Sequence, residues 1–241
     1  EFYEGRYFNP GWEKAIDVSW DGYQVPMGMK LLFSCDNVEN LVVGAEICED
    51  VWVLNPPSIA HASAGATVIV NCSASDEVTG KSEYRRSLIS GQSARLLCAY
   101  IYANAGEGES SQDLVFGGQN IIAENGNILS ESARFENQTI YADIDLERLE
   151  CERRRMTTYQ TEDREDYRFV SFTLDRKPRD RSDPVCPTRC GQPEPPLRGD
   201  PFDPGDGIEK TSQTYRMSPC CRWYFRRSGF NAGTFSNRAR L

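Results

Sequence analysis

Histidine is almost missing from this sequence, since His61 is its only copy in 241 residues. A Ser-His-Asp triad would have to use this one side chain, and a histidine-rich metal site would have no second ligand. His61 lies in the run IAHASAG, whose small residues predict a helix. We therefore interpret it as a structural histidine, and we expect no metal site in the chain.

Long apolar runs and an excess of positive charge are also missing. No stretch of about 18 apolar residues occurs, so the sequence predicts no membrane-spanning helix. The chain carries 36 acidic and 27 basic residues, a net charge of −9, whereas nucleic-acid binding needs concentrated positive charge. We expect neither a membrane nor a nucleic acid as a partner. The opening EFYEGRYF has no initiator Met and no leader pattern, so we expect the sequence to start inside a longer protein.

Proline is scarce in the first 175 residues and abundant after them. Nine of the 13 prolines lie between residues 178 and 219, and an arginine-rich, aromatic stretch without periodicity follows. This composition is typical of a linker or a disordered segment. We expect residues 1–160 to form one domain, 161–175 a connector, and 176–241 a tail that is disordered or out of frame.

Apolar runs and turn signals alternate along the first part of the chain. They predict strands at residues 31–34, 41–47, 67–71, 99–104, 119–123, 127–130 and 138–144, and helices at 59–64, 83–97 and 146–156. Asn125-Gly126 predicts a hairpin between two of these strands. On the second helix, we interpret Glu83, Arg85 and Arg86 as a solvated or interface-facing surface. Alternating strands and helices followed by a hairpin favour an α/β domain with a mixed sheet.

Cysteine, by contrast, is frequent, with nine copies. Most of the cysteines before the tail are typical of reduced thiols in a cytosolic protein, and this indicates a cytoplasmic location. In the tail, Cys186, Cys190, Cys220 and Cys221 are only a weak zinc signal, because their spacing is irregular and no histidine accompanies them. Cys48 differs from the others because it follows the apolar run LVVGAEI, at a strand end where α/β proteins place reactive groups. From spacing alone, a core cysteine and a nucleophile are equally good interpretations.

Several separate motifs around Cys48 agree in order and spacing with one known family. GAEICEDVWVLNPPS, AGATVIVNCSAS, GKSEYRR and AYIYANAGEGESSQDLVFGGQ resemble the carbon–nitrogen hydrolase (nitrilase) superfamily. Within it, the match is closest to the glutaminase domain of glutamine-dependent NAD synthetases. The opening EFYEGRYF resembles the segment that follows the catalytic lysine of that domain. The resemblance covers about residues 1–160 and implies a four-layer α-β-β-α sandwich, present here in part because the N-terminal portion of the domain is lacking.

The resemblance also implies a mechanism for hydrolysing the side-chain amide of glutamine. A glutamate base activates a cysteine, the thiolate forms a thioester with the substrate, and a lysine stabilises the oxyanion. Cys48 matches the nucleophile, and Glu1 matches a second glutamate that positions the lysine and the substrate. The residues that match the substrate pocket are Phe2, Glu4, Glu49, Trp52, Ser75 and Lys81. The lysine and the base glutamate of the family match no residue of this chain, so we expect the chain alone to hydrolyse glutamine little or not at all.

Finally, the resemblance implies a use for the released ammonia. In the family, a synthetase domain uses ATP and Mg²⁺ to amidate nicotinic acid adenine dinucleotide to NAD, and its SGGxDS phosphate loop is absent from residues 160–241. We expect no cofactor for the glutaminase domain. Its expected partners are glutamine, the synthetase domain, and further copies of itself in a homo-oligomer of the intact protein. A stand-alone nitrilase-type amidase for another small amide and an inactive fragment are the alternatives.

Overall fold

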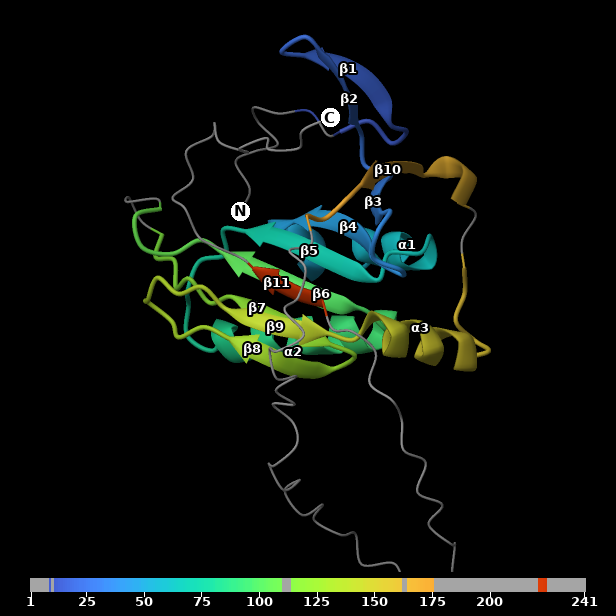
Figure 1. Cartoon of the computed structure of the whole chain (residues 1–241). Coiled ribbons are helices and arrows are strands. Elements are labelled where there is room, and N and C mark those ends of the chain that lie inside the picture. The colour runs from blue at the N-terminus through green and yellow to red at the C-terminus, as the bar shows by residue number, and fades with distance from the viewer. Residues whose placement is uncertain (1–8, 10, 110–113, 162–163, 176–220, 225–241) are drawn as a thin grey trace, which may run out of the picture. The chain divides into compact units, whose positions relative to one another are not determined.

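Figure 1 shows the chain as a computed structural model, which describes residues 9, 11–109, 114–161, 164–175 and 221–224. Every element named below belongs to one compact unit, Glu1–Leu174 with Ser218–Leu241. The tail expected at residues 176–241 lies outside the described residues, apart from one short strand at 221–224. In the part of the chain that the structure describes, no helix is both long and apolar enough to cross a membrane.

A mixed sheet forms the centre of this unit (Figure 1). Its seven strands follow the order β10-β3-β4-β5-β6-β7-β8. β4, β5 and β6 run parallel to one another, whereas β3 pairs antiparallel with β4, and β7 with both β6 and β8. The predicted α/β class with a mixed sheet is confirmed. The strands are β3 (Leu31–Cys35), β4 (Val42–Ile47), β5 (Val68–Ser73), β6 (Ala99–Asn104), β7 (Ile121–Glu124), β8 (Asn127–Glu131) and β10 (Arg168–Phe172).

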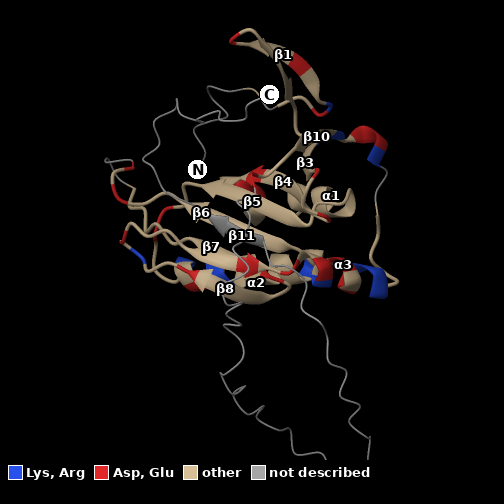
Figure 2. Ribbon diagram, viewed as in Figure 1, with Lys and Arg blue, Asp and Glu red and all other residues tan. Residues whose placement is uncertain are grey.

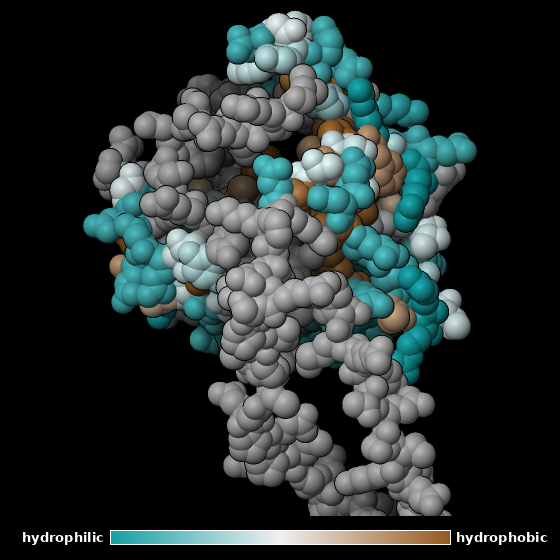
Figure 3. Space-filling view, in the orientation of Figure 1, coloured by the Kyte–Doolittle hydropathy of each residue, from teal (hydrophilic) through white to brown (hydrophobic). Residues whose placement is uncertain are grey.

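Two hydrophobic cores cover the two faces of the sheet. Since successive residues of a strand point to opposite faces, Tyr100 and Ile101 of β6 belong to different cores. The first core joins the sheet to α1 (Pro57–Ser63) and α2 (Lys81–Leu96). The second joins it to α3 (Leu146–Arg155), and on this face hydrophobic surface is visible over β3 and β4 (Figure 3). All three helices were predicted from the sequence, and α2 was predicted by its apolar periodicity.

A small antiparallel sheet lies beside the large one. It consists of β9 (Tyr141–Ile144) and β11 (Cys221–Tyr224), and β9 contacts both β7 and β8. The described residues therefore hold one large mixed sheet with helices packed on it, in agreement with the α/β class that the family resemblance implies.

A hairpin of β1 (Ile16–Trp20) and β2 (Tyr23–Met27) is missing from the predicted elements. Asp21 and Gly22 join its strands, with positive φ angles of 49° and 82°. Asp-Gly is the sequence signal for such a two-residue turn, so the hairpin was detectable from the sequence.

The stretch expected to be a connector supplies the edge strand β10, which pairs parallel with β3. Ion pairs link the hairpin and the residue Lys14 before it to this edge of the sheet, and Figure 2 marks where charged residues occur along these elements. Asp17 of β1 lies 2.7 Å from Arg168, and Lys14 lies 3.4 Å from Asp166. The partner of β10 lies far away in the sequence, so no local pattern announces the pairing.

Candidate active site

Cys48 stands where β4 ends and a 3₁₀ turn, η2 (Cys48–Trp52), begins. The prediction that it follows a strand is confirmed. Its φ angle is +49°, in the left-handed region that costs a residue with a side chain roughly 1–2 kcal/mol. The carboxylate of Asp50 accepts the N–H of Ile47 at 2.7 Å and closes the turn. The tight turn leaves the Cys48 residue half-buried at the carboxyl edge of the parallel strands.

A buried asparagine from the neighbouring strand holds both backbone groups of Cys48. Asn71 of β5 is 1% exposed. Its Oδ1 accepts the N–H of Cys48 at 3.0 Å, and its Nδ2 donates to the carbonyl oxygen of Cys48 at 3.3 Å. The same Nδ2 donates to the hydroxyl of Tyr100 at 3.3 Å. The sequence pattern gives no role to Asn71, because the only signal of this residue is its place at the end of a predicted strand.

A buried carboxylate continues this network. Tyr100 donates its hydroxyl proton to Glu46, and the N–H of Ser58 donates to the other Glu46 oxygen at 2.8 Å. Burial raises the pKa of Glu46, although the hydrogen bonds from Tyr100 and Ser58 oppose that shift. Burial, together with the Glu46 carboxylate, also raises the pKa of Tyr100 well above its usual value. These contacts reach the backbone of Cys48 through Asn71, so the network supports the position of Cys48.

Trp52 and Lys81, two of the residues predicted to line the pocket, lie together. The ammonium of Lys81 stands 5.6 Å from the centre of the Trp52 ring and forms an ion pair with Asp76. The Tyr84 ring lies 5.3 Å from the Trp52 ring. The hydrogen bond from Lys81 lowers the pKa of Asp76, which therefore stays ionised. This corner offers one positive charge, one negative charge and an aromatic wall.

Ser75 is held rigidly next to this corner. Its N–H donates to Oδ1 of Asn104 at 2.8 Å, and its carbonyl accepts from Nδ2 of Asn104 at 3.1 Å. Its hydroxyl accepts from Arg85 at 3.2 Å. Burial raises the pKa of Tyr102, whose hydroxyl donates to the hydroxyl of Ser73 at 2.7 Å. Because β4, β5 and β6 are parallel, the residues that follow them meet at one edge.

Arg85 corrects one prediction. It was expected on a solvated or interface-facing surface, yet it is 0% exposed. It forms an ion pair with Glu77 and donates to Gln119 at 2.5 Å. Glu77 lies in the loop before α2 and Gln119 in the segment before β7, so the charge pattern of the helix alone could not reveal them. Glu83 and Arg86 are exposed, as predicted.

The other predicted residues are placed as follows. Glu49 is half-buried beside Cys48, whereas Glu1, Phe2 and Glu4 lie outside the described residues. His61 lies in helix α1 and is buried, with its ring nitrogens 3.0 Å from the Tyr167 hydroxyl and 3.1 Å from the Ala45 carbonyl oxygen. These contacts fit the structural role predicted for it.

The remaining cysteines of the described chain differ from Cys48 in their surroundings. Cys98 is fully buried, and burial raises its pKa to about 12. Cys72 and Cys151 are exposed, and Cys35 is buried. Within the described ranges, no three acidic, cysteine or histidine side chains gather closely enough to hold a metal ion. The tail cysteines lie outside these ranges, except for the backbone of Cys221.

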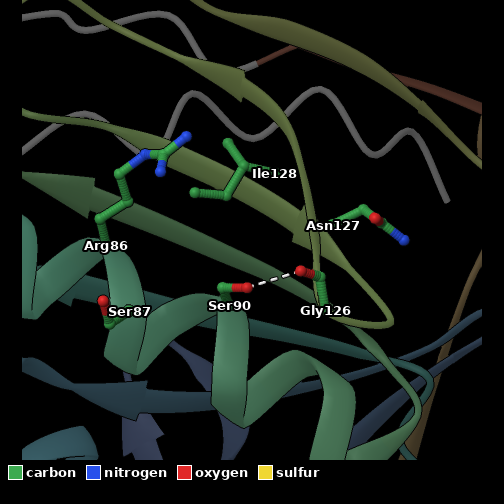
Figure 4. A pocket seen from close by; sticks show the side chains of 6 residues that line it. All are labelled: Arg86, Ser87, Ser90, Gly126, Asn127 and Ile128. Carbon is green, nitrogen blue, oxygen red and sulfur yellow. Dashed lines mark hydrogen bonds between the residues drawn. The ribbon is translucent and has the colours of Figure 1, made fainter. Parts of the chain in front are cut away.

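A shallow cavity of about 280 Å³ lies elsewhere, between α2 and the β7–β8 hairpin (Figure 4). Ser90 spans it by donating to the carbonyl oxygen of Gly126 at 2.6 Å. Its lining contains none of the residues predicted for the active site. It is lined by Arg86, Ser87, Ser90, Gly126, Asn127 and Ile128.

Comparison with known proteins covers most of the chain, including the Cys48 region. The sequence model of the family described as "Carbon-nitrogen hydrolase" matches residues 3–154. The glutamine-dependent NAD(+) synthetase of Mycobacterium tuberculosis (strain H37Rv) is 44% identical over 183 residues, which are 73% of this chain and 27% of that protein. Its counterpart in Mycobacterium leprae is 43% identical over 184 residues, again 73% of this chain and 27% of the relative. The chain thus spans about a quarter of the length of these curated relatives.

Solved structures match about half of the chain. A crystal structure of a glutamine-dependent NAD(+) synthetase from Cytophaga hutchinsonii matches 56% of this chain and 21% of that chain, with 31% identity and a TM-score of 0.46. A carbon–nitrogen hydrolase from Helicobacter pylori G27 matches 47% of this chain and 43% of that chain, with 21% identity and a TM-score of 0.40.

Proposed function

Because the chain belongs to the carbon–nitrogen hydrolase family, we propose that it is part of the glutaminase of a glutamine-dependent NAD synthetase. It removes ammonia from the side-chain amide of glutamine, and a synthetase domain uses that ammonia to form NAD. The observation that carries this proposal is the placing of Cys48. A thiol stands in a tight turn at the edge of the sheet, in a sequence 44% identical to NAD synthetases.

The chemistry assigned to Cys48 is nucleophilic. Its thiolate attacks the amide carbon of glutamine, and the carbon–nitrogen bond breaks as the proton taken from the thiol passes to the leaving ammonia. A thioester remains on the sulfur, and water hydrolyses it to glutamate and free thiol. A thiol with a pKa near 8.5 needs an adjacent base, and the oxyanion needs a charged donor. The family's groups for both tasks match no residue of this sequence, which is why we expect little turnover from it alone.

Charges of both signs suit the other end of glutamine, which carries an ammonium and a carboxylate. Lys81 offers an ammonium to the carboxylate, and Asp76 an ionised carboxylate to the ammonium. The Trp52 ring beside Lys81 packs against the apolar stem of the substrate. The buried, doubly anchored Ser75 fixes this corner relative to the sheet.

The test separates hydrolysis of glutamine from use of its ammonia. In the native polypeptide that joins this chain to a synthetase domain, Cys48→Ala should abolish NAD formation from glutamine. Formation from ammonium salts should survive, because that step does not use the thiol. Cys72→Ala removes an exposed thiol from the neighbouring strand and serves as the control, since both activities should persist. Glutamine-dependent synthesis by the Cys48→Ala variant would disprove the proposal.

A further inference from the structure

We propose that Asn71 is a positioning residue, which holds the Cys48 backbone in the conformation that presents the thiol. The inference rests on the proposed role of Cys48 as nucleophile. The positioning role of Asn71 is argued from its hydrogen bonds in the structure.

The conformation of Cys48 needs support from outside its own turn. Its φ angle of +49° is unfavourable for a residue with a side chain. Such a conformation persists only where the surroundings determine it. The preceding residue, Ile47, is 69% exposed, so packing around it contributes little.

Asn71 supplies that support from the adjacent parallel strand. The φ angle sets the direction of the Cys48 N–H, and the ψ angle sets the direction of its carbonyl. Oδ1 of Asn71 accepts the Cys48 N–H at 3.0 Å, and Nδ2 of Asn71 donates to the Cys48 carbonyl oxygen at 3.3 Å. One side-chain amide therefore holds both soft dihedral angles of the residue that carries the thiol.

The Asn71 amide is itself oriented by its neighbours. Tyr100 uses its hydroxyl proton for Glu46, so its oxygen is left to accept from Asn71 at 3.3 Å. With Nδ2 committed to that hydroxyl, Oδ1 faces the Cys48 N–H. The other oxygen of Glu46 accepts the N–H of Ser58 at 2.8 Å, which anchors the series to α1. Three strands and one helix thus fix the amide.

The two hydrogen bonds from the Asn71 side chain to the Cys48 backbone, called the clamp from here on, have a consequence for the oxyanion. The N–H of the nucleophile is the nearest backbone donor to the reacting sulfur, and in this structure Asn71 occupies it. The oxyanion must therefore be stabilised by other donors, of which the next N–H, that of Glu49, is the first along the turn.

Two nearly isosteric substitutions separate positioning from stability. Asn71→Leu removes all three hydrogen bonds of the amide. Thr67→Val removes a buried hydroxyl at the opposite end of the same two strands, where it donates to the carbonyl of Asn40 at 2.6 Å and accepts the N–H of Val42 at 3.1 Å. Both variants should melt at a lower temperature than the wild type.

The kinetics of the native polypeptide should then differ between them. Asn71→Leu should lower kcat with glutamine by on the order of 100-fold, as expected for a displaced reacting group, with little change in KM. Ammonia-dependent synthesis should be retained, and Thr67→Val should keep its glutamine kinetics. An unchanged kcat in Asn71→Leu, or an equal loss in Thr67→Val, would overturn the role of Asn71.

Exchange of the Cys48 amide hydrogen, followed by NMR, tests the clamp without any turnover. It should be about tenfold faster in Asn71→Leu, the factor that corresponds to one hydrogen bond, and unchanged in Thr67→Val. Absence of glutamine turnover in the wild type would refute the proposed function, and the exchange rates would then decide on the clamp. An unchanged exchange rate of the Cys48 amide hydrogen in Asn71→Leu would refute the clamp.

Discussion

Arg85 shows how a single buried charge shapes this site. Its guanidinium is fully buried and is balanced by Glu77, whose side chain is 6% exposed. It also donates to the hydroxyl of Ser75 at 3.2 Å and to the carbonyl oxygen of Asp76 at 3.3 Å. Taking a cation out of water is costly unless it is paired and hydrogen-bonded. Arg85 therefore ties the start of α2 to the loop that carries two candidate pocket residues.

Replacing Arg85 should destabilise the fold strongly. Arg85→Met leaves the buried Glu77 carboxylate with the half-exposed Arg134, 3.6 Å away, as its remaining ion-pair partner, so the free energy of unfolding should fall by about 3–5 kcal/mol. Arg86→Met is the matched control on the same helix, because Arg86 pairs with Glu131 at 2.9 Å with a half-exposed side chain, and it should cost less than about 1 kcal/mol. Urea unfolding followed by circular dichroism measures both. Equal losses in the two variants would contradict this account.

Some roles can be predicted from a residue's own chemistry or from a family motif. Roles that depend on contacts with residues distant in the sequence cannot be predicted in this way. Cys48 stood out because it ends an apolar strand, and Trp52 and Lys81 because they match a family pattern. Arg85 and Asn71 gave no such signal. Their roles depend on Glu77, Gln119 and Tyr100, which only folding brings within hydrogen-bond distance.

At the scale of elements, the parallel strands β4, β5 and β6 create the site. Their carboxyl ends lie side by side, so η2 and the loop after β5 begin at the same edge of the sheet. The sequence predicted these strands because each is a short apolar run between turn signals. It missed β10 because that strand pairs with β3 from far along the chain. The β7–β8 hairpin was predicted through Asn125-Gly126, and both residues have positive φ.

Gly126, in the turn between β7 and β8, should tolerate an added side chain less well than Gly91 of α2. Its φ is +85°, and a Cβ there would lie 3.1 Å from the Cβ of Ala94, so Gly126→Ala should cost about 1–2 kcal/mol. Gly91→Ala is the control, because nothing lies within 4 Å of its added Cβ and alanine favours a helix interior by about 0.5–1 kcal/mol. The melting temperature should fall in the first variant and rise in the second. A rise in both would show that the turn tolerates a side chain.

At the scale of the whole molecule, the chain covers only part of the relatives that it matches. It spans 27% of the Mycobacterium tuberculosis relative. It contains the thiol, the clamp on its backbone and the charged corner at Trp52. Glu1, Phe2 and Glu4 lie outside the described residues, and their assignment to the site stays a prediction. The proposed function therefore requires above all that Cys48 is the thiol that attacks glutamine.

Labelling with a diazoketone analogue of glutamine tests that claim most directly. In the native polypeptide, peptide mass spectrometry should find the adduct on Cys48, and an excess of glutamine should slow its formation. Cys72 and Cys151 are exposed, so they control for simple accessibility and should react far less. Equal labelling of these cysteines, or labelling of Cys48 that glutamine does not slow, would contradict the account.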